Sequence, residues 1–213
     1  MIVEQMEIGN FQVFCYILGD DGSGEGIVID PGGSAEAIVA RAQEIGVRTI
    51  SWIVNTHGHV DHVARNADLQ RLTGAPIAIH EADAPALSNQ SGYALAMFEG
   101  IPSPPASRLL RDGDKIEFGR SHVEVIHTPG HTPGAICLYT PGFVITGDTL
   151  FVAGVGRTDL PGGSCKGLMQ SIRTRLFTLP DETVVLPGHD YGITPTSTIA
   201  REKLENVFCR EEC

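Results

Sequence analysis

The chain of 213 residues has no long apolar run and few basic residues. Its apolar stretches are too short to span a bilayer, and the acidic segment 1–10 is neither a signal peptide nor a membrane anchor. Lys and Arg number 15 against 26 Asp and Glu, which gives a formal net charge of −11. Because a negative field repels polyanions, we expect neither nucleic acid nor a membrane as a partner.

Cysteine is also scarce, with five residues and no C-x-x-C pair. An odd number without paired spacing predicts a reduced, cytoplasmic protein rather than a disulfide scaffold. Cys209 and Cys213 lie near the end of the chain at helical spacing. A second metal or redox feature is one interpretation of this pair, and an incidental tail is the interpretation that we prefer.

Short β-rich runs alternate with helical patterns along the chain, in two similar halves. In the first half we expect strands at 11–18, 26–30, 50–56 and 76–79, and helices at 34–45 and 60–72. In the second half we expect strands at 115–118, 122–126, 135–139, 143–146 and 183–186, and helices at 164–176 and 195–208. The alternation predicts one domain, residues 1–213, of the α/β (α+β) class, with two sheets face to face and helices outside.

The segment 81–108 is less regular than the rest, with loop-like stretches on either side of a short apolar patch. Two interpretations remain open for it. It is either a lid over a site or a surface excursion without a special role.

The strongest signal is the run His57-Gly58-His59-Val60-Asp61-His62, which directly follows a predicted buried strand. Neutral imidazole and carboxylate groups are the usual ligands of zinc and similar divalent ions. One turn of chain cannot easily aim four such groups at a single ion. Division between two adjacent ions is easier, with His57 and His59 on one ion and Asp61 and His62 on the other.

Three further candidate ligands, His131, Asp148 and His189, each follow a strand-like run and a glycine. Loops at the ends of a rigid sheet are where functional side chains usually converge. The sequence therefore predicts a centre for two divalent metal ions. Zinc is the expected ion, although iron and manganese also suit these ligands.

The remaining histidines, His80, His122 and His127, have no comparable setting, and we expect structural roles for them. Asp30 ends a predicted strand before Pro31-Gly32-Gly33. It either orients a metal ligand through a hydrogen bond or caps the turn that follows.

The H-x-H-x-D-H run and the later Gly-His, Gly-Asp and Gly-His elements resemble the signature of the metallo-β-lactamase superfamily, in the family's order and over nearly the whole chain. The resemblance implies a four-layer αββα sandwich of two mixed sheets, with the site at one edge of the sheets. It also implies a ligand set by motif matching: metal 1 on His57, His59 and His131, metal 2 on Asp61, His62 and His189, and Asp148 bridging both.

Within this superfamily the pieces GHTPGAICLY, GDTLFVAGVGRTDLPGG and LPGH are similar to those of the hydroxyacylglutathione hydrolases (glyoxalase II). Two departures concern the glutathione contacts of the long form. Arg157 matches a basic position of that family, but Asp159 stands where a Tyr is expected. Only 24 residues (213 − 189) follow His189, so the family's C-terminal helical region is mostly absent, as in short bacterial-type relatives.

The persulfide dioxygenases are a close cousin by the same criterion. They share GRTD after the bridging Asp and an element like His189-Asp190-Tyr191. The resemblance implies one iron for them, held by residues that match His57, His131 and Asp148.

We expect a metal-dependent hydrolase in which a hydroxide that bridges two ions attacks a thioester carbonyl. Asp61 would be the catalytic residue, because it is expected both to hold metal 2 and to orient the nucleophile. A thiol of pKa about 8.5 leaves without a strong general acid, which favours a thioester over an amide.

Three residues are candidates for binding the substrate, a small thioester or glutathione-type thiol compound. Arg157 would pair with a substrate carboxylate, the alternative being an ion pair with Asp159. Lys166 is a weaker candidate of the same kind, with a solvated role as the alternative. Tyr191 follows a ligand directly and would line the pocket, unless it only packs there.

Three other functions compete with hydrolysis. The first is oxidation of a persulfide at a single iron. The second is metal binding without catalysis, which the complete ligand set argues against. The third is RNA cleavage, which the low basic count and the lack of a recognisable RNA-binding arm argue against. Monomer and dimer remain open.

Overall fold

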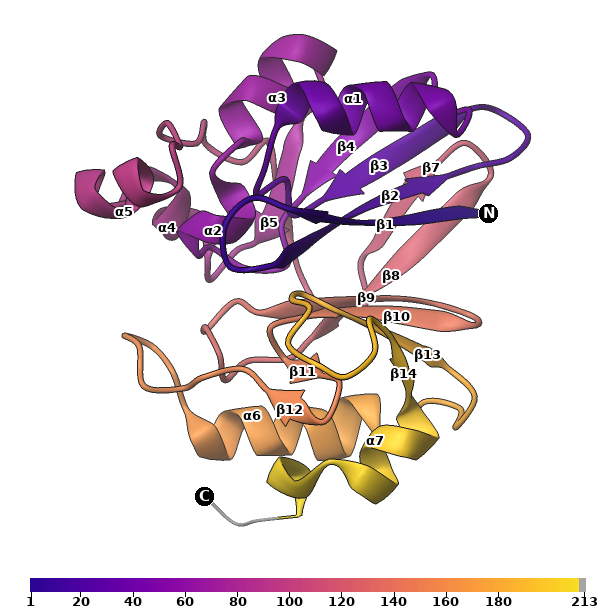
Figure 1. The fold of residues 1–213 in the computed structure, drawn as a ribbon, viewed down its shortest axis with the longest axis vertical. Coiled ribbons are helices and arrows are strands. Elements are labelled where there is room, and N and C mark those ends of the chain that lie inside the picture. Colours follow the sequence, from indigo (N-terminus) through magenta and orange to yellow (C-terminus); the bar gives the residue numbers. More distant parts are fainter. Residues whose placement is uncertain (211–213) are drawn as a thin grey trace.

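Two six-stranded mixed sheets lie face to face in the computed structural model, which describes residues 1–210 (Figure 1). The first sheet has the spatial order β1 (Ile2–Ile8), β2 (Val13–Gly19), β3 (Glu25–Ile29), β4 (Thr49–Val54), β5 (Ile77–His80), β6 (Arg108–Leu110). The second has the order β14 (Ser197–Thr198), β13 (Val184–Pro187), β10 (Phe143–Gly147), β9 (Ile136–Thr140), β8 (Ser121–His127), β7 (Lys115–Phe118). A ribbon of β11 (Leu150–Phe151) and β12 (Gly154–Val155) completes the strands of the described chain.

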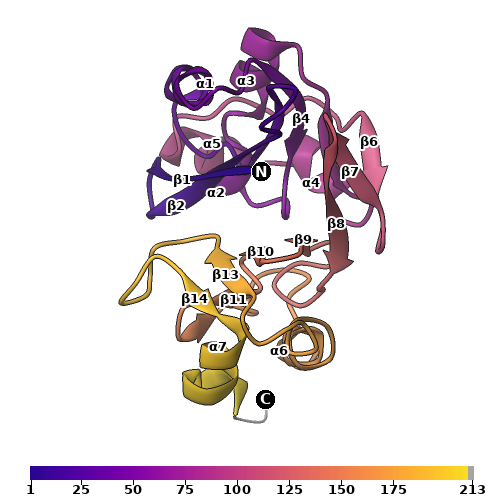
Figure 2. The ribbon, with the colours of Figure 1, turned by 90° about the vertical axis from the view of Figure 1, so that its right-hand side faces the viewer.

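Helices cover the two outer faces, so the molecule has the four layers that the resemblance implied (Figures 1 and 2). The first half contributes α1 (Ala35–Glu44), α2 (Val60–Val63), α3 (Asn66–Thr73), α4 (Ala84–Ser88) and α5 (Gly92–Met97). The second contributes α6 (Cys165–Ser171), a π-helical turn at Ile172–Leu176, α7 (Ile199–Glu205) and a 3-10 turn at Val207–Cys209. The predicted α/β sandwich class is confirmed.

Strand β2 shows how the layers are held together. Its residues are buried on both faces. Because successive side chains of a strand point to opposite faces, Tyr16 and Leu18 join the core between the two sheets. Cys15 and Ile17 point the other way and pack beneath the helices of the first half.

The expected helix over 60–72 is wrong in its continuity, because α2 ends at Val63 and α3 starts at Asn66. The break has a physical reason. The backbone N–H of Arg65 donates to the carbonyl of Pro31 at 3.1 Å instead of to a helical carbonyl. The interruption leaves α2 as a single turn, which carries the predicted metal ligands Asp61 and His62.

Other boundaries also differ from the sequence predictions. The helix expected at 34–45 is present as α1, and Ser34 caps it by accepting from Ala37 N. The sequence did not reveal β1, whose partner along its whole length is β2. The helix expected over 195–208 begins later, because residues 197–198 pair with β13 as a strand.

The thiols of Cys15, Cys137 and Cys209 are free and buried. Cys213, the other half of the pair considered with Cys209, lies outside the described residues. No helix within residues 1–210 is long and apolar enough to cross a membrane.

Replacement of Tyr16 by Phe tests the link between the sheets. The buried hydroxyl of Tyr16 donates to the carbonyl of Pro187 at 2.6 Å and accepts from Gln5 Nε2 at 2.9 Å. Without the hydroxyl, a buried carbonyl loses its donor, which costs about 1 to 2 kcal/mol. We expect urea unfolding to show that loss for Tyr16→Phe.

Tyr139→Phe is the matched control for this measurement. The Tyr139 side chain is half-buried in β9, and none of residues 1–210 hydrogen-bonds to its hydroxyl. Its stability should match that of the unaltered chain. Equal unfolding midpoints for the two variants would show that the Tyr16 hydroxyl contributes nothing.

Candidate metal centre

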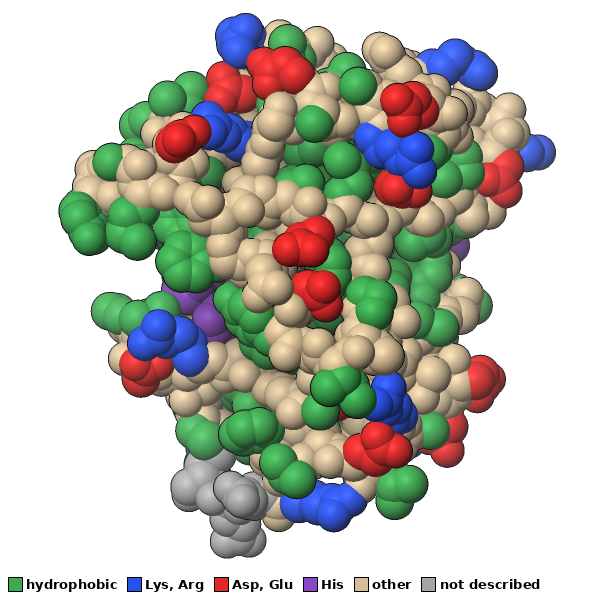
Figure 3. All heavy atoms as spheres, in the orientation of Figure 1, with side chains coloured by type: hydrophobic (Ala, Val, Ile, Leu, Met, Phe, Trp, Pro, Cys, Tyr) green, Lys and Arg blue, Asp and Glu red, His purple; other side chains and the backbone are tan. Residues whose placement is uncertain are grey.

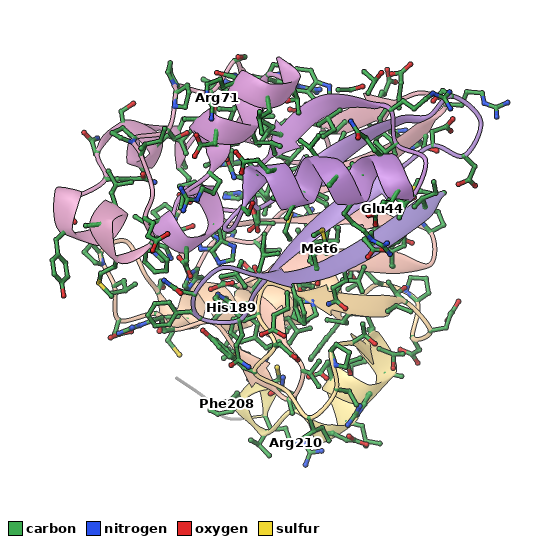
Figure 4. The ribbon with its side chains drawn as sticks, turned by 45° about the horizontal axis from the view of Figure 1, so that its top comes forward. Met6, Glu44, Arg71, His189, Phe208 and Arg210 are labelled. Atoms are coloured by element: carbon green, nitrogen blue, oxygen red, sulfur yellow. The ribbon has the colours of Figure 1, made fainter. Side chains whose placement is uncertain are left out.

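The seven predicted metal ligands converge at one edge of the two sheets. His57, His59, Asp61 and His62 follow β4, His131 lies between β8 and β9, and Asp148 and His189 follow β10 and β13. Figure 4 shows His189 where the two halves of the chain meet. In Figure 3 histidine side chains are visible in a hollow at the left of the molecule, bordered by hydrophobic side chains. The loops that carry these residues therefore meet in one place.

Among residues 1–210 three groups of three close donors occur, of which two share no residue and form the centre; the third, Asp30, His57 and His62, overlaps both. In the first group, His57, His59 and His131, the donor atoms lie within 4.8 Å of one another. His131 Nε2 approaches His59 Nδ1 to 2.8 Å. The second group, Asp61, His62 and His189, meets the same limit of 4.8 Å.

Asp148 lies between the two groups. Its Oδ1 is 3.4 Å from His62 Nε2, which belongs to the second group. Its Oδ2 is 3.4 Å from His131 Nε2 in the first group and 3.4 Å from His189 Nε2 in the second. The carboxylate therefore faces both groups, which is the place of a bridging ligand. Gly188 makes this approach possible, since a Cβ at that position would collide with Asp148 Oδ1.

The outer hydrogen bonds fix which ring nitrogen faces the centre. His131 Nδ1 lies 2.7 Å from the carbonyl oxygen of Arg157, and His189 Nδ1 lies 2.7 Å from that of Phe11. A carbonyl oxygen can only accept, so each Nδ1 carries the proton and donates. In the neutral ring the Nε2 lone pair is then directed at the centre, as metal ligation requires.

These lone pairs make the centre a fit for cations. His62 Nε2 and His189 Nε2 lie 3.2 Å apart although neither has a proton to share when both rings are neutral. The buried atoms His57 Nε2 and Asp148 Oδ1 have no hydrogen-bond partner among residues 1–210. Buried polar atoms without a partner are costly, and a bound cation satisfies both kinds of atom at once. The donor set is one that divalent metal ions prefer.

The electrostatics of the centre point the same way. Burial, together with the neighbouring His62, holds the pKa of His57 well below its usual value. Burial and His131 lower the pKa of His59 to about 4. Both rings are therefore neutral ligands at neutral pH, and in this respect the site is ready for an ion.

His62 is different, since burial opposes its charging but the carboxylates of Asp148, Asp61 and Asp30 prevail and raise its pKa to about 10. Burial also opposes charging of Asp148, yet the neighbouring His62 and His189 bring its pKa well below the usual range. When no ion is bound, a proton on His62 therefore supplies part of the positive charge that the centre favours. A cation competes with that proton.

Asp30 supports the second group of donors through His62. This was one of the two interpretations of the sequence, in which Asp30 orients a metal ligand. Its Oδ2 is 3.0 Å from His62 Nδ1 and accepts from Thr56 Oγ1 at 2.6 Å, while its Oδ1 accepts from Thr56 N at 2.8 Å. The residue is buried and has a φ of 52°, an uncommon backbone for a non-glycine residue. The contact with His62 confirms that Asp30 orients a predicted ligand.

Asp83 is a residue of the centre that the sequence did not reveal. Its buried carboxylate accepts from Gly58 N at 2.9 Å, Thr132 Oγ1 at 2.7 Å and Gly134 N at 2.7 Å. It thus ties the loop of His57 and His59 to the loop of His131. No motif marks Asp83, because its partners are 25, 49 and 51 positions away along the chain.

The three histidines expected to be structural lie outside both groups. His80 and His127 stack on each other, with ring centroids 4.0 Å apart. Burial and the neighbouring His127 lower the pKa of His80. His122 is exposed on β8.

A cavity of about 640 Å³ opens beside the donors. Arg157 and Tyr191 line it, and the Tyr191 ring stacks on His189 at 4.5 Å. Arg157 makes a two-pronged ion pair with Asp159, with distances of 2.7 and 2.6 Å, which was the alternative to a substrate contact. Lys166 is exposed on α6 and is not among the residues of the cavity wall.

The segment 81–108 contains α4 and α5 and forms part of this cavity wall. Ala94 and Phe98 line the cavity. The ring centroid of Phe98 lies 5.3 Å from that of Phe11, which comes from a different part of the chain and also lines the cavity. The segment 81–108 therefore contributes to the wall of the cavity, which favours the interpretation as a cover over a site rather than as a surface excursion without a role.

Two relatives whose names state an enzymatic activity are similar to this chain over almost its full length. A hydroxyacylglutathione hydrolase of Haemophilus influenzae is 33% identical, with 98% of each chain covered. The human mitochondrial persulfide dioxygenase is 34% identical, with 94% of this chain and 72% of that protein covered. These two relatives carry out different reactions, so their identities alone do not assign one.

Solved structures agree with the fold. The crystal structure of TTHA1623 in a di-iron-bound form has a TM-score of 0.84 at 36% identity and covers 97% of this chain and 100% of that one. The BLEG-1 B3 metallo-β-lactamase has a TM-score of 0.88 at 31% identity, with 99% and 100% covered. The family model of the metallo-β-lactamase superfamily matches residues 8–189, which span all seven donors. The chain thus belongs to the metallo-β-lactamase superfamily.

Proposed function

We propose that this chain is a hydrolase of small thioesters, similar to glyoxalase II, with two divalent metal ions, zinc foremost, at its centre. The observation that carries the proposal is the pair of three-donor groups with the Asp148 carboxylate between them. One ion would be held by His57, His59 and His131, and the other by Asp61, His62 and His189. Similarity to the Haemophilus influenzae hydrolase supports the choice of reaction.

When bound, the ions would polarise the thioester carbonyl and lower the pKa of a water molecule from 15.7 to about 7. Water adds to the carbonyl carbon, and the carbon–sulfur bond breaks. The products are a carboxylate, a thiol and one proton. Because the sulfur leaves as a thiolate of low basicity, the reaction needs no residue to protonate it.

The chain's own residues have defined tasks in this reaction. The side chain of Asp61 is 20% exposed and lines the cavity. Its carboxylate can therefore accept a proton from the attacking water while it also serves as a metal ligand. Burial, aided by Asp148 and Asp61, raises the pKa of Tyr191. Its hydroxyl therefore stays protonated at neutral pH and can donate to the substrate.

Persulfide oxidation at one iron is the second candidate, since the human persulfide dioxygenase is 34% identical to this chain. That reaction needs only a subset of the donors, matching His57, His131 and Asp148. Both reactions are compatible with the seven residues. The number of ions bound and the consumption of oxygen separate them.

Metal content is the first test. We expect two divalent ions per chain in protein purified without added metal, measured by inductively coupled plasma mass spectrometry. Asp148→Ala removes the carboxylate shared by both groups and should retain at most one ion. His122→Ala removes an exposed histidine outside the centre and should retain both.

One iron per chain, with the second position empty, would favour the dioxygenase over the hydrolase. A complete lack of tightly bound metal would refute the metal centre itself.

The reaction is tested with a lactoyl thioester of glutathione and with glutathione persulfide. We expect release of free thiol from the thioester and no oxygen uptake with the persulfide. Asp61→Asn should lower kcat for the thioester by about a hundredfold or more, because it removes the proton acceptor. Oxygen uptake by the unaltered protein, without thioester hydrolysis, would replace this proposal with the second candidate.

Asp83→Asn tests how the chain holds the first donor group. The Asn side chain cannot accept all three hydrogen bonds that Asp83 accepts from Gly58 N, Thr132 Oγ1 and Gly134 N, since one carboxylate oxygen is replaced by an NH₂ group. We expect the affinity for zinc, measured by calorimetric titration of metal-free protein, to fall about tenfold or more. Asp181→Asn, at an exposed carboxylate paired with Lys203, is the matched control. Identical zinc titrations for both variants would rule out a positioning role for Asp83.

A further inference from the structure

The wall of the cavity differs in character from its floor. The floor consists of metal donors, whereas the wall is made mostly of apolar side chains. Its largest members are Phe11, Phe98, Phe151, Leu160, Tyr191 and Phe208. Apart from the five predicted donors that line the cavity, Arg157 and Tyr191 are the ionisable residues of its lining within the described part of the chain.

The apolar side chains come from several separate segments that meet at the cavity. Phe11 follows β1, Phe98 ends α5, and Phe208 belongs to the turn after α7, where Figure 4 marks it below His189. Phe151 and Tyr191 meet edge to face at 5.6 Å. Such contacts are preferred geometries for aromatic pairs, so the wall is arranged before a ligand arrives.

Three of these rings remain about half exposed: Phe11 at 52%, Tyr191 at 54% and Phe208 at 51%. Apolar surface gathered around a cavity marks a place where a ligand or partner is bound. A ligand that covers these rings must itself be apolar where it touches them. The burial of that surface supplies the binding free energy.

The charges of the wall argue against an anionic ligand. At neutral pH glutathione carries two carboxylates and one ammonium group, and its binding calls for cationic partners. The guanidinium of Arg157 is already engaged by both carboxylate oxygens of Asp159. Lys166 lies outside the wall, and the net charge of the chain is −11. Away from the metal centre, where bound ions would attract anions, the surrounding field therefore disfavours substrates with additional negative charge.

We propose that the substrate is a thioester with an apolar acyl chain on an uncharged or small thiol, and that Phe11, Phe98 and Phe208 hold the acyl chain. This inference rests on the proposed thioesterase function and names its substrate class. Acyl groups that are longer cover more of the wall, and hydrolysis is faster for them until the cavity is filled. A glutathione moiety gains no ionic partner from the wall.

The test compares acetyl, butanoyl and hexanoyl thioesters of N-acetylcysteamine, an uncharged thiol, with the same thioesters of glutathione. We expect kcat/KM to rise about fourfold for each added methylene, the value for full burial. For a given acyl group the N-acetylcysteamine ester should be hydrolysed at least as efficiently as the glutathione ester. An advantage of about tenfold for glutathione, with no dependence on chain length, would overturn the inference and leave the thioesterase function standing.

Phe98→Ala tests, in the same assay, whether this part of the cavity wall contacts the acyl chain. It should reduce the ratio of hexanoyl to acetyl kcat/KM about tenfold. Tyr93→Ala is the matched control, because Tyr93 lies on α5 with 79% of its surface exposed and is not part of the cavity wall. Its chain-length dependence should equal that of the unaltered protein, and an unchanged ratio in Phe98→Ala would contradict the assignment of this wall.

A binding measurement separates the inference from the catalytic proposal. S-hexyl-N-acetylcysteamine is a thioether that cannot be hydrolysed, and calorimetry should show tighter binding to the unaltered protein than to Phe98→Ala. S-methyl-N-acetylcysteamine should bind more weakly to both. If these differences appear but no thioester is hydrolysed, the apolar wall is correct and the proposed function is wrong. If S-hexylglutathione binds much more tightly than the uncharged thioether, the inference fails.

Discussion

The crowding of seven metal donors into one place is the constraint on which the rest of the structure depends. Ring nitrogens of neighbouring ligands face one another at 2.8 and 3.2 Å, and the Asp148 carboxylate lies among them. Without positive charge at the centre such an arrangement is unfavourable, so the scaffold must hold it in place. It does so with hydrogen bonds on the outer side of the donors, where backbone carbonyls fix the rings of His131 and His189 and the buried carboxylate of Asp30 fixes that of His62.

The two sheets supply the rigidity for this arrangement, because their edges are joined at the centre itself. Phe14 N donates to Gly188 O at 2.8 Å, and Asp190 N donates to Gln12 O at 2.9 Å. Strand β2 is thereby attached to both sides of His189. On the other side, Ile136 N donates to Thr56 O at 2.9 Å and connects β9 with the loop before His57. The loops of the centre are parts of the sheet framework rather than free excursions.

A feature of the fold or the metal centre could be predicted from the sequence when the residues that define it lie close together along the chain. The run from His57 to His62 is local, and the strand before it ends in a glycine-containing loop, so its chemistry is readable from the sequence. The later donors each carry a glycine next to the ligand, which makes them recognisable as well. Asp83 has no such local sign, since its partners come from two distant loops. Strand β1 was missed for a related reason, because only its pairing with β2 defines it.

The same distinction applies to the cavity. The donors are encoded in short motifs on the ends of strands, whereas its apolar wall is assembled from residues 11, 98, 151, 191 and 208, which no motif connects. Changes in the wall therefore need not disturb the donors, and members of one superfamily can share a metal centre while acting on different substrates. For this chain the physical consequence is that reactivity and selectivity have separate structural origins. The donors decide which chemistry bound metal ions could supply, and the distribution of charge and apolar surface around them decides which molecules reach them.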